Sequence, residues 1–176
     1  MFPSEMLKNS SRDVKQYQRY KGVLRDSIGS LVKFGQMKYN DSEKWTFIQL
    51  DYTRQMELQK HPELKLPNAE SVVVPEAKFT KYFFGGENES GLAKGKAFLS
   101  RLRYGLDNWE ELQKEIYERV PKYPAKFWDN NGYGDRYEQK IIIYGKNGKP
   151  ANVIVGWICK KDMTTSMSSV YIKENR

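Results

Sequence analysis

The stretch that decides the fold lies near the C-terminus and reads DRYEQKIIIYGKNGKPANVIVGWIC, residues 135–159. Two β-prone segments, near 135–144 and 151–159, flank the turn Lys146-Asn147-Gly148. Asn-Gly favours hairpin turns because both residues tolerate positive φ angles. A third β-prone segment follows near 166–173. Because only a few residues separate these segments, we expect an antiparallel meander.

Helical patterns precede this block. We expect helices over residues 75–84, 90–103 and 107–119, followed by a loop over 121–134 that carries aromatic side chains. The predicted fold class is therefore α+β, with N-terminal helices followed by an antiparallel sheet of three or four strands.

The first third of the chain also has helical spacing. We expect helices over 10–26 and 31–38, and a third that starts at residues 40–43 and places Trp45, Ile48 and Tyr52 on one face. Two prolines in residues 61–68 break any helix and mark a domain boundary. The sequence thus predicts a helical connector at 1–62, docked on a functional domain at 63–176.

Composition indicates a polyanionic partner. The 176 residues carry 30 basic and 22 acidic side chains, a net charge of +8, and 39% are hydrophobic. Such a balance favours nucleic acid as the partner. The single cysteine, Cys159, lies in an apolar run and is expected to be a buried thiol. Without a Cys/His cluster or a run of 18 apolar residues, we expect no zinc site, no cofactor and no membrane span.

The N-terminal residues bear on how the protein would be exported. Charged residues follow Met1-Phe2-Pro3-Ser4, so no secretory signal peptide is expected. We therefore expect an exported form to travel as the tail of a longer protein.

Catalysis by histidine is not expected. The only histidine, His61, lies in the linker, so the domain at 63–176 contains none. RNA supplies its own nucleophile, the 2′-hydroxyl, and its cleavage needs a base, an acid and donors for the developing negative charge. Lysine, arginine, tyrosine and hydroxyl side chains can divide these tasks without a metal.

Several segments resemble a known family of toxin domains. They are residues 66–75, 78–82, 91–98, 134–137, 156–158 and 168–171, in that order. Their order and spacing resemble the C-terminal effector domains of bacterial polymorphic toxins, found at the ends of contact-dependent growth inhibition and LXG-type secreted proteins. The predicted helical connector at 1–62, which contains the motif at 33–40, resembles the segment that precedes such toxins.

The resemblance implies an interbacterial competition toxin that cleaves RNA, tRNA among the candidates, in the cytoplasm of target cells. It also implies a small-RNase-like fold, in which a helix packs on a four-stranded sheet. A cognate immunity protein must then protect the producing cell, and we expect it to be acidic.

Five residues are the predicted catalytic set: Lys94, Arg136, Tyr137, Ser169 and Tyr171. The resemblance matches Lys94 to the family's lysine and places hydroxyl residues at the end of the last strand. We expect Lys94 and Arg136 to bind phosphate, with the hydroxyl groups transferring protons. Arg136 and Tyr137 are consecutive on a strand, so one faces the nucleic acid and the other the core.

Four further residues are predicted to contact nucleic acid: Asn88, Lys96, Trp157 and Ser168. Lys96 points about 200° away from Lys94 on the helix. Trp157 is either a core residue or a platform for base stacking, and Ser168 is expected to face away from Ser169. Asn88 stands where the family often has histidine. Arg103 stands where the family usually has glycine, so a left-handed backbone there would be strained.

Two alternatives remain open. Glu138 and Lys140 share one face of a strand, with Asp129 or Asp135 before them. This combination is typical of metal-dependent DNases, in which carboxylates hold Mg²⁺ and a lysine steadies the attacking water. The other alternative is a non-catalytic basic module that binds nucleic acid.

Overall fold

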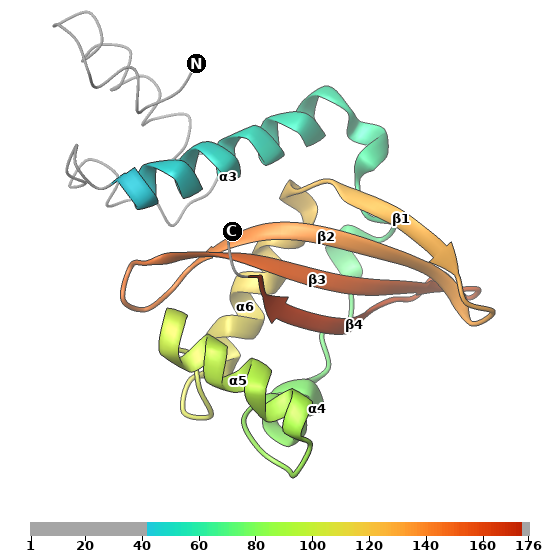
Figure 1. Cartoon of the computed structure of the whole chain (residues 1–176). Coiled ribbons are helices and arrows are strands. Elements are labelled where there is room, and N and C mark those ends of the chain that lie inside the picture. The colour runs from blue at the N-terminus through green and yellow to red at the C-terminus, as the bar shows by residue number, and fades with distance from the viewer. Residues whose placement is uncertain (1–41, 174–176) are drawn as a thin grey trace, which may run out of the picture.

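A computed structural model describes residues 42–173, and Figure 1 shows helices packed on a single sheet. The longer helices are α3 (Ser42–Lys60), α5 (Glu89–Leu102) and α6 (Trp109–Arg119). Shorter helical segments are η2 (Pro62–Leu64), η3 (Ala69–Ser71), α4 (Glu76–Lys78), the π-helix η4 (Phe79–Phe83) and η5 (Val120–Lys122). The strands are β1 (Ala125–Asn130), β2 (Gly134–Tyr144), β3 (Pro150–Lys160) and β4 (Thr165–Ile172).

The predicted α+β class is confirmed. The strands form one antiparallel sheet in the order β1-β2-β3-β4. The predicted helices match α4 with η4, α5 and α6 to within a few residues, and the three predicted strands match β2, β3 and β4. The prediction of a loop over 121–134 is wrong, because β1 lies within it. The helices predicted over 10–26 and 31–38 lie outside the described residues.

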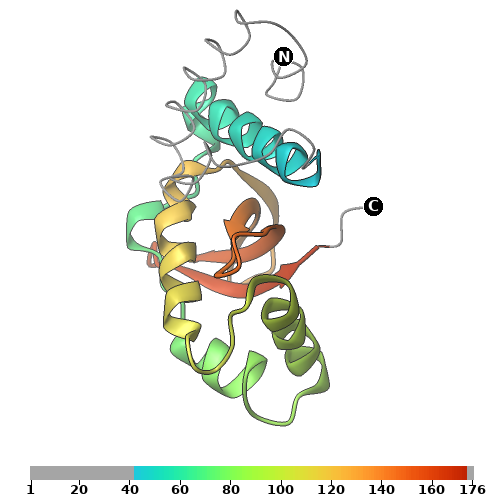
Figure 2. The same ribbon diagram turned by 90° about the vertical axis from the view of Figure 1, so that its left-hand side faces the viewer.

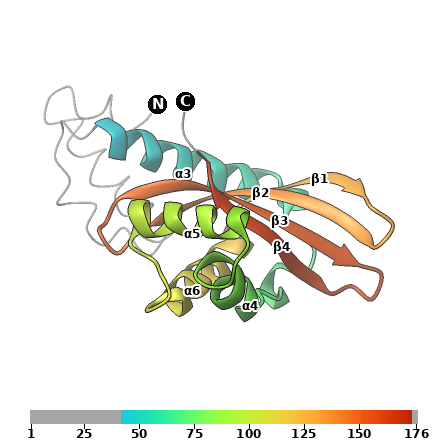
Figure 3. The same cartoon turned by 60° about the horizontal axis from the view of Figure 1, so that its bottom comes forward.

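One face of the sheet carries the main hydrophobic core. Alternate residues of β2 point to this face, including Ile141 and Ile143, which lie opposite Val153 and Ala151 of β3. They pack against Phe98 and other apolar residues of η4, α5 and α6. Figures 1 and 3 show α4, α5 and α6 together on this side. We call it the core face.

The opposite face of the sheet is partly covered by α3. Figure 2 shows the sheet between α3 on one side and α5 on the other. Trp45, Phe47 and Ile48 of α3 are buried, and Tyr52 is half-buried. The shared face predicted for this helix is confirmed. The second face of the sheet, which we call the open face, is left uncovered where α3 ends.

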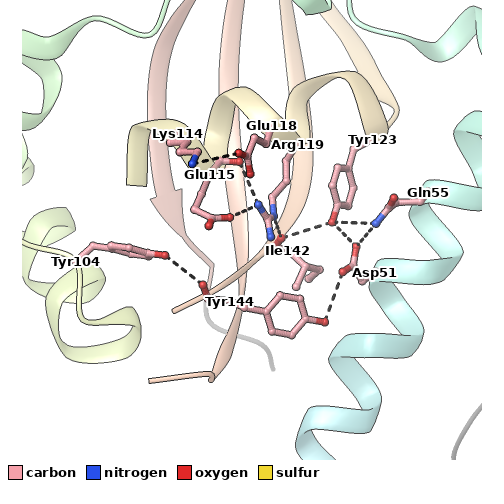
Figure 4. Close-up of polar contacts among 10 residues, drawn as sticks. All are labelled: Asp51, Gln55, Tyr104, Lys114, Glu115, Glu118, Arg119, Tyr123, Ile142 and Tyr144. Atoms are coloured by element: carbon pink, nitrogen blue, oxygen red, sulfur yellow. Dashed lines mark hydrogen bonds and ion pairs between the residues drawn. The ribbon is translucent and has the colours of Figure 1, made fainter. Parts of the chain in front are cut away.

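A buried polar network fixes α3 to the sheet (Figure 4). Gln55 Nε2 donates to Asp51 Oδ1 over 2.9 Å, and the Tyr123 hydroxyl donates to the same oxygen. On the sheet side, Arg119 Nε donates to the Ile142 carbonyl over 2.8 Å. Burial raises the pKa of Asp51 to about 6, although the hydrogen bonds from Tyr123 and Gln55 oppose this shift. The helix is therefore joined to the sheet by polar as well as apolar contacts.

Arg103 ends α5 in the left-handed region, with φ 64° and ψ 32°. Its N–H donates to the Leu99 carbonyl over 3.1 Å, which satisfies one of the free carbonyls of the last helical turn. A Cβ atom is unfavourable in this conformation, so the predicted backbone strain at Arg103 is present.

Candidate functional site

A pocket of about 370 Å³ opens beside the C-terminal half of α3, on the open face of the sheet. Its lining comes from three parts of the chain: Arg54 and Glu57 from α3, Leu64 from η2, and Pro124, Ala125, Lys126, Phe127, Glu138 and Lys140 from β1, β2 and the residue before β1. The pocket therefore joins α3 and the sheet in one concave surface.

Glu138 and its neighbours form a row across the open face. Lys126 of β1 lies directly opposite Glu138, which lies opposite Gly156 of β3, which in turn lies opposite Ser169 of β4. Lys140 is two residues along β2 from Glu138, so both side chains point to the same face. The row thus combines a carboxylate, two ammonium groups and a hydroxyl.

A bulge in β4 brings Ser168 into this row. The register shifts at Gly156/Trp157, so Ser168 is the extra residue between the partners of Gly156 and Trp157. A Cβ atom added to Gly156 would lie 2.6 Å from Ser169 Oγ and 3.2 Å from Ser168 Oγ. Both hydroxyls therefore occupy the space that a side chain at Gly156 would take. The prediction that Ser168 faces away from Ser169 is wrong, because a strict alternation of side chains fails at a bulge.

The charges in the pocket are mostly unpaired. Within residues 42–173, Glu138, Lys126 and Lys140 make no ion pair and no side-chain hydrogen bond. Glu138 is half-buried, whereas both lysines are exposed. Arg54 is anchored because its Nη1 donates to Asn152 Oδ1 over 2.8 Å, and burial lowers its pKa. A half-buried carboxylate thus lines the same pocket as three cations, and its oxygens can accept hydrogen bonds from a ligand.

Arg136 lies on the same face, two residues before Glu138. Its Nε and Nη2 each donate to one carboxylate oxygen of Asp129 over 2.6 Å. These two hydrogen bonds raise the pKa of Arg136 and lower the pKa of Asp129. Arg136 therefore borders the row with its guanidinium held in a fixed orientation.

Lys94 belongs to a different cluster, at the β4 edge of the sheet. Its Nζ lies 5.8 Å from the ring centroid of Tyr82 and 5.8 Å from that of Tyr171. Arg136, in contrast, lies in the row of Ile158 and Ser166, five residues before Tyr171 on β4. The structure brings Lys94 and Tyr171 together and does not bring Arg136 to them.

Two predicted aromatic residues point away from the open face. Tyr137 packs against the core face and lies edge-on to Phe127, with ring centroids 5.7 Å apart. Trp157 is fully buried, and its Nε1 donates to Gln139 Oε1 over 3.1 Å. The prediction that Trp157 contacts nucleic acid is therefore wrong, since no base can reach its ring.

Asn88 and Lys96 belong to α5 and its N-cap. Asn88 caps α5, because its Oδ1 accepts a hydrogen bond from the Gly91 N–H over 2.9 Å. Lys96 is exposed on α5, while Lys94 is half-buried against the tyrosine rings. The amide oxygen of Asn88 is thus engaged in capping the helix.

The described part of the chain has neither clustered metal ligands nor a membrane-spanning helix. Residues 42–173 contain no group of three or more His, Cys, Asp or Glu side chains that could hold a metal ion. His61 is exposed, with Nδ1 3.3 Å from Glu63 Oε1. None of the described helices is long and apolar enough to cross a membrane.

The sequence did not point to Arg54, Glu57 or Lys126 as members of the site. Arg54 and Glu57 lie in the segment predicted to be a connector, and Lys126 lies in the predicted loop. The available signal was the pair of β-prone aromatic residues Phe127 and Trp128 beside Lys126. No sequence pattern indicated that α3 would end beside β1.

Comparisons with known proteins identify the family. The chain belongs to the family described as "Domain of unknown function (DUF6883)", which matches residues 65–174. The match covers the helices from η3 onward and the whole sheet, and it leaves α3 outside. No curated protein and no solved structure matches the chain.

Proposed function

We propose that the chain cleaves RNA by metal-independent phosphodiester transfer in the pocket around Glu138. The observation that carries the proposal is the half-buried Glu138 carboxylate, which has no partner within the described residues and has Lys126 opposite it. A carboxylate of this kind can act as the base in RNA cleavage without histidine, and cations beside it can stabilise the developing negative charge.

The residues divide the chemistry as follows. The Glu138 carboxylate takes the proton of the 2′-hydroxyl, whose oxygen then attacks the adjacent phosphorus. The bond from phosphorus to the 5′-oxygen breaks, and that oxygen takes a proton from a lysine ammonium group. The products are a 2′,3′-cyclic phosphate and a free 5′-hydroxyl. Lys126, Lys140 and Arg54 stabilise the negative charge that develops on the phosphate.

The other predicted site residues act as contacts for the RNA strand. Arg136 and the Ser168 and Ser169 hydroxyls flank Glu138 on the open face. Lys94 and Tyr171 lie further along the β4 edge, where they can contact a neighbouring nucleotide. In this proposal Tyr137 plays no chemical part, because its ring packs on the core face.

The alternative hypothesis, a metal-dependent DNase, uses the same Glu138 and Lys140 but needs further carboxylates to hold Mg²⁺. Both oxygens of Asp129 accept hydrogen bonds from Arg136, and Asp135 Oδ1 accepts one from Asn130 Nδ2 over 2.9 Å. These contacts favour the RNase over the DNase.

The wider role follows from the resemblance to toxin effector domains. In this proposal the domain is delivered as the tail of a secreted protein and stops the growth of target bacteria by cleaving RNA in their cytoplasm. An acidic immunity protein covers the open face, and complementary charge speeds its association.

The test is incubation of the full chain with total RNA and with plasmid DNA, each with and without EDTA. We expect RNA cleavage that EDTA does not reduce, and intact DNA. Cleavage that EDTA abolishes and Mg²⁺ restores would support the DNase. Binding of both nucleic acids without cleavage would support the non-catalytic module.

A further inference from the structure

Exposed aromatic side chains gather at one end of the sheet. Phe127 is 53%, Trp128 58% and Tyr133 78% exposed. Within residues 42–173, Tyr117 is the one other aromatic residue that is similarly exposed, and its hydroxyl is engaged by the Val74 N–H. Large rings exposed together within seven residues are unusual on a surface that serves only solubility.

The backbone that carries these rings is ordered by local contacts. The strand β1 shifts register between Phe127 and Asp129, so Trp128 is the extra residue of a bulge. The turn that follows is closed by side chains, because the Gly132 N–H donates to Asn130 Oδ1 over 2.8 Å and the Tyr133 N–H to Asn131 Oδ1 over 3.0 Å. A bulge and a closed turn therefore fix the backbone positions from which the rings project.

The aromatic group reaches the pocket through one member, Phe127. Phe127 lines it together with Lys126 and Glu138. Proteins that hold single-stranded nucleic acid combine cationic side chains, which bind its phosphate backbone, with aromatic rings on which its bases stack. In a duplex the base faces are covered by their neighbours and cannot reach a protein ring.

We propose that Phe127, Trp128 and Tyr133 form a stacking site for unpaired bases, so that the substrate of the pocket is single-stranded RNA. This inference rests on the proposed function, since it names the substrate class of the same pocket. A protein partner or a second copy of the chain on these rings is the alternative that the experiment must separate.

Binding is measured with an uncleavable probe, a single-stranded 2′-O-methyl octanucleotide with a fluorescent label, against the same sequence as a duplex. We expect the duplex to bind at least about tenfold more weakly. Trp128→Ala and Tyr133→Ala should each weaken binding of the single strand by roughly 5- to 150-fold, the range for loss of one base–ring stack. The control is Leu106→Ala, which removes another exposed apolar side chain, 55% exposed, and should leave binding unchanged.

Tryptophan emission gives a second readout. Trp45 and Trp157 are buried, and Trp109 stacks on Phe79 with ring centroids 5.5 Å apart. Quenching by the single strand should therefore disappear in Trp128→Phe and persist in Trp109→Phe. Equal affinity for strand and duplex, or unchanged binding in both alanine variants, would overturn the inference. So would self-association of the wild type that Trp128→Ala abolishes.

The two proposals fail separately. A protein that binds the single strand through Trp128 but cleaves no RNA keeps the stacking site and loses the proposed function. A protein that cleaves single-stranded and duplex RNA equally, with Trp128→Ala as active as the wild type, keeps the function and loses the stacking site.

Discussion

Individual side chains on the open face differ in how their charges are used. Both carboxylate oxygens of Asp129 accept hydrogen bonds from Arg136, whereas Glu138 has no partner within the described residues. The Glu138 carboxylate is half-buried in the pocket, and no side chain of residues 42–173 takes up its oxygens, so a ligand can reach them. This difference, rather than the abundance of charge, singles out Glu138.

Arg103 offers a test of backbone strain. Its φ of 64° is unfavourable for any residue with a Cβ atom. We expect Arg103→Gly to raise the free energy of unfolding by about 1 kcal/mol, which corresponds to roughly 2–4 °C in Tm for a chain of this size. Thermal unfolding measures it, with Arg103→Ala as the control that keeps the strain. A glycine variant no more stable than the alanine variant would contradict this account.

Asp51 makes stability depend on pH. Its pKa is about 6 in the folded state against 3.8 for an ordinary aspartate, so the folded state binds the Asp51 proton more tightly than the unfolded state does. The resulting stabilisation is fully present below about pH 4 and is lost as the pH rises through 6, a change of up to about 3 kcal/mol.

Asp51→Asn should remove this dependence. Between pH 4.5 and 7.5, we expect its stability relative to the wild type to rise, because the wild type alone pays for ionising a buried carboxyl group. Urea unfolding at a series of pH values measures the difference, and Asp107→Asn, at an exposed position, is the control. A difference that stays constant with pH would show that Asp51 does not titrate in this window.

At the scale of the elements, α3 is part of the folded domain although the family match begins at residue 65. Its Ile48 is fully buried, and its Asp51 accepts a hydrogen bond from the hydroxyl of Tyr123, which lies just before β1. The helix also supplies Arg54 and Glu57 to the pocket. The division at residue 62 stays a prediction, but α3 contributes to both packing and the proposed site.

Ile48→Ala tests the docking of α3. We expect it to lower the free energy of unfolding by about 2–4 kcal/mol, as for other buried aliphatic truncations. RNA cleavage should fall as well, because Arg54 depends on the docked helix. Urea unfolding gives the comparison, with Thr53→Ala on the exposed side of α3 as the control. Wild-type stability in Ile48→Ala would mean that α3 is not docked in solution.

The strands show where sequence patterns were informative. Strands β2 and β3 were predicted because β-branched runs flank an Asn-Gly turn, and a short turn fixes the pairing of its neighbours. Strand β1 was missed because its bulge at Trp128 breaks the alternation of side chains and its flanks are rich in Pro, Gly and Asn. The bulge at Ser168 misled the assignment of faces for the same reason.

For the whole molecule, the two faces of the sheet have different tasks. The core face buries apolar side chains under η4, α5 and α6, and the open face keeps charged and hydroxyl groups exposed where α3 ends. The sequence predicted Arg136, Ser169 and Tyr171 as site residues but could not show that they lie in different rows. Which residues face each other across four strands depends on register, and that depends on bulges far from the residues concerned.

The central claim is that Glu138 abstracts the proton of a 2′-hydroxyl. The most direct measurement is the cleavage rate of a single-stranded RNA oligonucleotide in EDTA, for the wild type, Glu138→Gln and the surface control Glu87→Gln. We expect Glu138→Gln to lose roughly 10²–10⁴ in rate and Glu87→Gln to lose nothing, with 2′,3′-cyclic phosphate as the wild-type product. A 2′-deoxy nucleotide at the cleaved position should stop the reaction. Wild-type rates in Glu138→Gln, or cleavage that persists at the 2′-deoxy position, would contradict the account.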